Sequence, residues 1–104
     1  MAEVIWTEPA LNELDAIADY IALDNPLAAR ELVPRVFKHV GQLIDHPDSG
    51  SIPRDLPDRR YREIVEPPCR IFYRRDRDTL YVLYVVRGEQ QLRKSLLAGR
   101  DSSK

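Results

Sequence analysis

The chain has 104 residues and a mass of 12.1 kDa, the size of one domain, since single cores usually need about 100 to 150 residues. With 43% hydrophobic and 32% charged residues we expect neither disorder nor a membrane span, because no apolar run approaches the roughly 18 residues that cross a bilayer. A net charge of −1 and a pI near 6.1 disfavour indiscriminate binding of DNA or RNA, for which a pI above about 9 is expected.

The first quarter of the chain predicts a short strand and a helix. Residues 4–6 are apolar and stop at Thr7, which is a good helix N-cap, and Pro9 is tolerated in the first turn of a helix. Apolar residues then recur at helical spacing through residues 9–23, while acidic residues occupy the other faces. We therefore expect a strand that leads directly into an amphipathic helix.

A second helix is predicted to pack against the first as an antiparallel hairpin. Asn25 is a strong N-cap and Pro26 suits the first helical position, and the loop between the helices is short. Pro34 lies inside the apolar pattern, where we expect it to kink the helix without breaking it. His46 is followed by proline and ends the helix, and residues 47–58 are predicted to form a long ordered loop.

The second half of the chain has the period of β-strands. Residues 61–66, 70–75 and 80–86 are rich in Tyr, Ile, Val and Phe and are separated by turn residues, which predicts an antiparallel meander. The last of these strands is apolar on both faces, as is typical of a strand at the centre of a sheet. Residues 92–97 favour a short C-terminal helix, and residues 99–104 a flexible tail.

These elements predict an α+β fold in which the helix hairpin covers one face of a small antiparallel sheet. Residues 1–98 would form the single domain, and we expect the other face of the sheet to be available for function. Cys69 is the only cysteine, so neither a disulfide nor a cysteine-held zinc ion is expected. The N-terminus MAEVIWTEP lacks the basic and apolar regions of a secretion signal, so we expect a cytoplasmic protein.

Charge is unevenly distributed along the chain. Up to Pro53 there are three basic and nine acidic residues, and after it thirteen basic and eight acidic ones. An acidic half is thus joined to a basic half, and such segregation indicates a partner with matching charged patches.

The sequence resembles the RelE/ParE superfamily of toxins from bacterial type II toxin–antitoxin modules. The resemblance lies in the order and spacing of VIWTEPALNELDAIADYIA, HPDSG and RRYREIVEPPCRIFYRRDRDTLYVLYVVRG. It implies the same α+β fold and a partner antitoxin of the ParD type, whose C-terminal segment wraps the toxin, with a toxin–antitoxin hetero-oligomer as a further expectation. It also implies one of two activities, inhibition of DNA gyrase (ParE-like) or mRNA cleavage on the ribosome (RelE-like).

Cleavage of RNA through its 2′-hydroxyl needs a base, a cation and an acid that converge on one phosphate. Arg70 resembles the phosphate-stabilising arginine of the nucleases, and Tyr81 and Arg87 would complete such a site. The segment RGEQQLRKSLLAGR, however, contains neither the histidine nor the tyrosine that the nucleases carry there. The sequence therefore favours the ParE-like branch, with no catalytic residue, no cofactor and no metal.

In that interpretation the basic residues would contact gyrase, with Arg70 and Arg87 as the leading candidates. The full set of gyrase-interaction candidates is Arg59, Arg60, Arg62, Arg70, Arg74 and Arg87. The antitoxin-interaction candidates are Glu13, Asp15, Asp19, Leu32 and Val36. A solvated surface is the simpler explanation for any one of these charged side chains. Neither a membrane nor sequence-specific nucleic acid is an expected partner, and a scaffold that binds only its antitoxin is a third interpretation.

Overall fold

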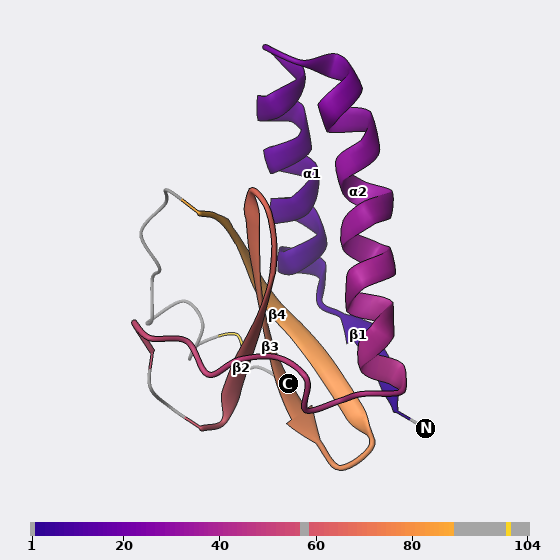
Figure 1. The fold of residues 1–104 in the computed structure, drawn as a ribbon, viewed down its shortest axis with the longest axis vertical. Helices are drawn as coiled ribbons and strands as arrows, with labels where there is room; N and C mark the ends of the chain where they lie inside the picture. Colours follow the sequence, from indigo (N-terminus) through magenta and orange to yellow (C-terminus); the bar gives the residue numbers. More distant parts are fainter. Residues whose placement is uncertain (1, 57–58, 89–99, 101–104) are drawn as a thin grey trace.

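The computed structural model describes residues 2–56, 59–88 and 100. Two long helices lie side by side and pack against a twisted four-stranded sheet (Figure 1). After the second helix the chain runs across the sheet before it enters the meander. The predicted α+β architecture is confirmed, whereas the predicted C-terminal helix at 92–97 lies outside the described residues, as does the predicted tail apart from Arg100.

The first strand and helix form where the apolar pattern predicts them. Strand β1 spans Glu3–Trp6 and helix α1 spans Glu8–Ala22, with Thr7 in an extended conformation between them. The Thr7 side chain does not cap the helix; its hydroxyl donates a hydrogen bond of 2.7 Å to the carbonyl oxygen of Val82. Thr7 therefore fastens the start of α1 to the sheet.

The second helix, α2, spans Pro26–Gly41 and continues as a short 3-10 turn over Gln42–Ile44. The Asn25 side chain accepts a hydrogen bond of 3.1 Å from the backbone N–H of Ala28, which confirms the predicted N-cap. Pro34 lies within the helix, which continues past it as predicted. The two helices thus form the expected hairpin.

The sheet is mixed and its strand order is β1-β4-β3-β2. Strands β2 (Tyr61–Glu66), β3 (Cys69–Asp76) and β4 (Thr79–Arg87) form the predicted antiparallel meander. Strand β1 pairs with β4 in parallel, so the expectation of a purely antiparallel sheet is wrong at this edge. Strand β4 lies between β1 and β3 and is buried on both faces, as its sequence predicts.

The sheet buries side chains on both faces. The main core lies between the helices and the sheet and includes Leu14, Leu32, Val36 and Ile71. A second apolar cluster lies on the opposite face and consists of the buried residues Tyr61, Phe72, Leu83, Tyr84 and Val86. We expected that face to be available for function, but a second apolar core covers much of it.

A register shift in the sheet explains part of this second core. Phe72 pairs with Tyr84 but Tyr73 pairs with Val82, so Leu83 is the extra residue of a bulge. Leu83 and Tyr84 both belong to the cluster away from the helices, although adjacent residues of a regular strand face opposite sides.

The edge of β4 beyond β1 is covered by side chains. Strand β1 pairs with β4 only as far as Val82. Farther along, the backbone N–H of Val85 donates to the Glu13 carboxylate at 3.0 Å. Arg100 donates to the same Glu13 oxygen at 2.8 Å and to the carbonyl of Leu83 at 3.2 Å. Polar side chains thus satisfy this short strand edge, beside which the described residues place no further strand.

Candidate functional site: the arginines of the sheet

Arg70 projects from β3 on the face away from the helices and is held by two carboxylates. Its Nε donates to Glu63 of β2 at 2.8 Å, and its two terminal nitrogens donate to Asp55 at 2.7 and 3.0 Å. The guanidinium also lies 4.9 Å from the centroid of the Phe72 ring. Arg70 therefore attaches the loop that contains Asp55 to the sheet.

The electrostatics of Arg70 agree with a structural role. The hydrogen bonds to Asp55 raise its pKa above the usual arginine value; burial opposes this effect, and the hydrogen bond to Glu63 supports it. A guanidinium that already binds two carboxylates has little residual charge for a phosphate or a partner protein.

Neither Arg87 nor Tyr81 shares a site with Arg70, although Arg87 directly follows Val86, the residue with which Arg70 pairs. The Arg87 guanidinium lies 4.0 Å from the ring centroid of Tyr20 on α1, so it belongs to the helix side of the sheet. Tyr81 is on the face away from the helices, but Arg70 pairs with Val86, five residues farther along β4. At about 3.3 Å per residue, roughly 15 Å of strand separates the positions of Tyr81 and Arg70. The three residues of the hypothetical nuclease site do not converge.

Most of the other predicted arginines do converge. A hollow of about 200 Å³ lies where β2 begins and β3 ends. We call it the arginine pocket, and it is lined by Asp48, Arg59, Arg60, Arg62, Tyr73, Arg74 and Arg75. Four of the six gyrase-interaction candidates are therefore neighbours, together with Arg75, which was not among them. The register explains their meeting, since Tyr61 pairs with Arg74 and Arg62 with Tyr73.

Tyr73 lies at the base of the arginine pocket. It is fully buried, and its hydroxyl accepts a hydrogen bond of 2.9 Å from the Gly50 N–H and donates one of 3.2 Å to the carbonyl of Pro47. Burial raises the pKa of this phenol above its usual value near 10, although the hydrogen bond with Gly50 lowers it. Arg62 binds the same segment through the carbonyls of Asp48 at 3.2 Å and Gly50 at 2.8 Å.

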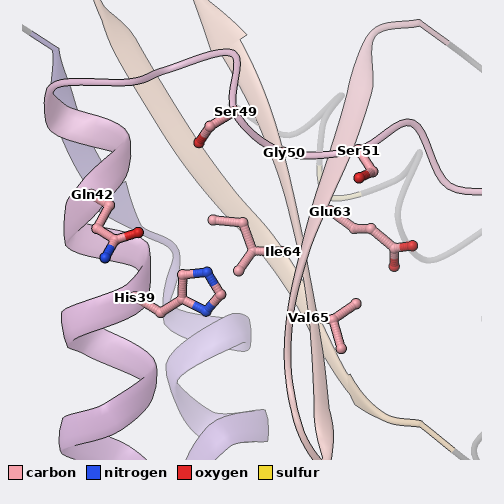
Figure 2. A pocket seen from close by; sticks show the side chains of 8 residues that line it. All are labelled: His39, Gln42, Ser49, Gly50, Ser51, Glu63, Ile64 and Val65. Carbon is pink, nitrogen blue, oxygen red and sulfur yellow. The ribbon is translucent and has the colours of Figure 1, made fainter.

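A second hollow contains His39, a residue of α2. We call it the histidine pocket; it measures about 380 Å³ and lies between α2 and β2 (Figure 2). His39 points from α2 toward β2, whereas the Glu63 carboxylate points away from it. His39 Nδ1 lies 3.0 Å from Glu66 Oε1, and the other oxygen of Glu66 accepts a 3.0 Å hydrogen bond from Arg35. The wide separation of His39 and Glu66 in the sequence hid this pairing.

The antitoxin-interaction candidates fall into three groups. Asp15 and Asp19 are exposed on α1, whereas Glu13 binds Val85 and Arg100. Leu32 and Val36 are 1% and 0% exposed and belong to the main core, so they offer no surface to a partner and their assignment is corrected. The apolar side chains that the hairpin does expose are Tyr20, Leu23, Leu27 and Phe37.

Two classes of site are absent from the part of the chain that the structure describes. None of its helices is long and apolar enough to cross a membrane. Within residues 2–56, 59–88 and 100, no three His, Cys, Asp or Glu side chains are grouped so that they could hold a metal ion.

Comparison with known proteins gives consistent matches. Residues 4–92 match the family described as "ParE toxin of type II toxin-antitoxin system, parDE". Toxin RelE2 of Caulobacter vibrioides is 39% identical over 74 residues, which are 70% of this chain and 80% of that protein. Putative toxin Y4kP of Sinorhizobium fredii is 37% identical over 86 residues, which are 83% and 88% of the two chains.

A solved structure has the same fold. One chain of a structure described as "Chromosomal ParDE TA system from P. aeruginosa" superposes on this protein with a TM-score of 0.70 at 23% sequence identity. The match covers 84% of the chain described here and 96% of that chain.

Proposed function

Because the chain belongs to the ParE toxin family of type II toxin–antitoxin systems, we propose that it is a cytoplasmic toxin that inhibits DNA gyrase by binding it. In this proposal the toxin catalyses no reaction and needs no cofactor. The arginine pocket and the surface around it form the working surface, and a cognate ParD-like antitoxin blocks the toxin.

The proposal that the toxin catalyses no reaction is supported by the positions of the three candidate nuclease residues. Arg70 is neutralised by Asp55 and Glu63, and Arg87 lies on the helix side of the sheet. Acid–base cleavage of RNA needs its groups within hydrogen-bond reach of one phosphate. Arg70, Tyr81 and Arg87 would have to rearrange the fold to meet that condition.

The exposed apolar residues of the hairpin support an antitoxin surface at its tip. Tyr20, Leu23 and Leu27 are 56%, 86% and 60% exposed and lie close together in the sequence at the turn between α1 and α2. Exposed apolar groups of this kind commonly mark protein interfaces. The neighbouring Asp19 and Asp24 would attract basic residues, so a partner with an apolar and basic amphipathic segment fits this tip.

The second candidate function is a ribosome-dependent mRNA endonuclease, and one observation favours it. A carboxylate at His39 Nδ1 orients the imidazole so that Nε2 can act as a base or acid toward the histidine pocket. His39 and Arg70, however, lie on opposite faces of the sheet, since Glu66 and Arg70 belong to different sides. A nuclease would therefore need a cation other than Arg70.

The deciding experiment adds the purified toxin to gyrase supercoiling reactions and, in parallel, to translating ribosomes with a labelled mRNA. We expect supercoiling to stop while the mRNA stays intact, and antitoxin to restore supercoiling. Cleavage of the mRNA with gyrase unaffected would assign the second function. In that case His39→Ala should abolish cleavage, whereas in the gyrase reaction the same variant should remain inhibitory.

A further inference from the structure

The backbone of Val65, on the outer edge of β2, is open to a partner. Strand β2 is the last strand of the sheet, so one of its edges faces away from β3. On that edge Glu63 exchanges backbone hydrogen bonds of 2.7 and 3.0 Å with Ser51. Alternate residues of an antiparallel strand direct their N–H and C=O groups to the same side, so Val65 presents its own pair where Glu63 does. Within the described part of the chain no hydrogen bond uses either of these Val65 groups.

The loop before β2 covers this edge at Glu63 but turns away before it reaches Val65. The turn is closed by the N–H of Ser49, which donates a backbone hydrogen bond of 3.1 Å. Past the other end of β2, Pro67 has no N–H, and its carbonyl already accepts a 2.9 Å hydrogen bond from Arg35. The open stretch of the edge is therefore short and is centred on Val65.

The histidine pocket opens onto this edge. Its lining includes Ile64 and Val65 of β2 and, across the space, His39 and Gln42. His39 and Gln42 project toward β2, and Ser49 points into the space between them and the strand (Figure 2). A strand residue takes up about 160 Å³, from a rise of about 3.3 Å, a strand spacing of about 4.8 Å and a layer spacing of about 10 Å. The pocket volume of about 380 Å³ therefore suits about two residues of an extended chain.

The side of α2 that faces the pocket is basic. His39 and Gln42 share a helix face with Arg35 and Lys38, since these positions are three or four residues apart. Residues 32–41 include no acidic residue. The Glu66 carboxylate of β2 is already paired, because it accepts from Arg35 and lies 3.0 Å from His39. Lys38 is exposed and forms no ion pair with any described residue, so a ligand with an acidic side chain is favoured here.

We propose that the edge of β2 at Val65 binds an extended peptide segment of a partner protein, which pairs with Val65 as an added strand and directs an acidic side chain toward Lys38. In strand addition, main-chain hydrogen bonds give affinity and pockets for alternate side chains give specificity. Both outward groups of Val65 would be used, and its side chain, now 51% exposed, would be covered.

A second copy of this chain fits the edge less well. If two β2 edges paired at Val65, the segment at Ser51 of each copy would occupy the position of the other copy's strand. The site is also separate from the hairpin tip, because Leu27 and His39 are twelve residues apart on α2, about 18 Å. Its occupation does not depend on gyrase being the target.

The test removes the backbone donor in one variant and keeps it in another. Val65→Pro lacks the outward N–H, and proline is tolerated on an edge strand where that group faces away from the sheet. Val65→Thr is the matched control, since it keeps the N–H and nearly the same side-chain shape. Urea unfolding establishes that both variants fold. The probes are acetylated and amidated hexapeptides in which valine alternates with glutamate or with lysine, and binding to the full chain is followed by two-dimensional NMR of its amides.

We expect the glutamate peptide to bind and to protect the Val65 amide hydrogen from exchange, and the lysine peptide to bind about two- to fivefold more weakly at low salt. Val65→Pro should weaken binding about tenfold, whereas Val65→Thr should change it less than about twofold. Lys38→Gln should reduce the preference for the glutamate peptide.

The proposal would be overturned by no binding of either peptide at about 1 mM, by equal binding to Val65→Pro and the unmodified protein, or by equal affinity for the two peptides. Self-association of the unmodified chain in sedimentation, if abolished by Val65→Pro, would assign the edge to a second copy instead. Should Val65→Pro not fold, the exchange rate of the Val65 amide with and without the glutamate peptide decides, because an unchanged rate excludes pairing at this residue.

Discussion

The backbone N–H of Gly50 donates a hydrogen bond of 2.9 Å to the hydroxyl of Tyr73, so the loop before β2 rests directly on a buried ring. Gly50 has no positive φ, and its need for glycine is steric. A methyl group added there would lie 2.7 Å from ring carbon Cε1 of Tyr73 and 2.9 Å from the carbonyl oxygen of Glu63. Neither group can move away easily, because Tyr73 is buried in the core and Glu63 is part of the sheet.

Gly50→Ala should therefore lower the free energy of unfolding by about 1–3 kcal/mol, the usual cost of overpacking. Gly41→Ala is the matched control, since Gly41 ends α2 and nothing lies within 4 Å of an added methyl group there. That control should stabilise the protein by about 0.5–1 kcal/mol, because alanine favours a helix over glycine. Urea unfolding of both variants measures the effects, and equal effects of the two substitutions would contradict this explanation.

Tyr73 should make stability fall at high pH. Its pKa is raised in the folded state, mainly by burial, so above the usual value near 10 the unfolded chain releases this proton while the folded chain keeps it. The unfolded state then binds fewer protons, and the free energy of unfolding decreases as the pH rises above about 10; below about pH 9 this phenol contributes no pH dependence.

Tyr73→Phe provides the comparison. At neutral pH it should be less stable than the unmodified protein by about 1–3 kcal/mol, because the Gly50 N–H and the Pro47 carbonyl lose their partner. The difference between the two proteins should shrink above about pH 10, since only the unmodified protein has this phenol to titrate. A difference that stays constant with pH in urea unfolding would show that Tyr73 titrates as it does in the unfolded chain.

Arg70 should prove to be a structural residue. Arg70→Ala leaves the largely buried Glu63 carboxylate without its cation and should cost about 2 kcal/mol in urea unfolding. Arg70→Lys should recover only part of that loss, because one ammonium group cannot reproduce the paired bonds to Asp55. Asp55→Ala removes the more exposed partner and should cost less than about 1 kcal/mol.

Inhibition of gyrase by Arg70→Lys should follow the fraction of folded protein. A variant that is fully folded and yet inactive would instead place Arg70 in direct contact with the target.

The tip of the hairpin should bind the antitoxin without contributing to stability. Leu23→Ser and Leu27→Ser replace exposed side chains and should change the free energy of unfolding by less than about 0.5 kcal/mol. Their affinity for the antitoxin, measured by calorimetry, should fall about tenfold or more if these leucines are interface anchors. Leu32→Ala should show the opposite pattern, with a loss of about 2–5 kcal/mol in stability. Unchanged antitoxin affinity in both serine variants would rule out the tip as an anchor.

Much of the fold could be predicted from local patterns. The helical spacing around Leu14 and Leu32 and the apolar run of β4 each depend on neighbouring residues in the sequence, and the structure confirms those elements. The parallel pairing of β1 could not be predicted in this way, because Glu3 pairs with Thr79 and no periodic pattern spans that separation. The bulge at Leu83 was hidden for a related reason, since it appears only when the registers of β3 and β4 are compared.

The candidate site, like the fold, could be predicted only in part from the sequence. Residue type and charge identified the arginines, and the pairing of β2 with β3 brought four of them together. Sequence could not reveal that Asp55 neutralises Arg70 or that Glu66 orients His39, because each partner comes from a different element. Leu32 and Val36 were misassigned for a different reason. Both lie on the apolar stripe of α2, and the fold buries that stripe in the main core, so it is not available to an antitoxin.

The parallel pairing of β1 with β4 also sets when the molecule can be completed during synthesis. Strand β1 is synthesised early, but its partner strand begins only at Thr79. The hydrogen bond from Thr7 to Val82 likewise cannot form until β4 has been synthesised. At roughly 5–20 residues per second, a bacterial ribosome needs several seconds to synthesise the intervening chain. The helix hairpin can form early, yet the centre of the sheet closes only after β4 has left the ribosome. A translation product truncated before β4 would therefore lack the strand that contributes to both apolar clusters.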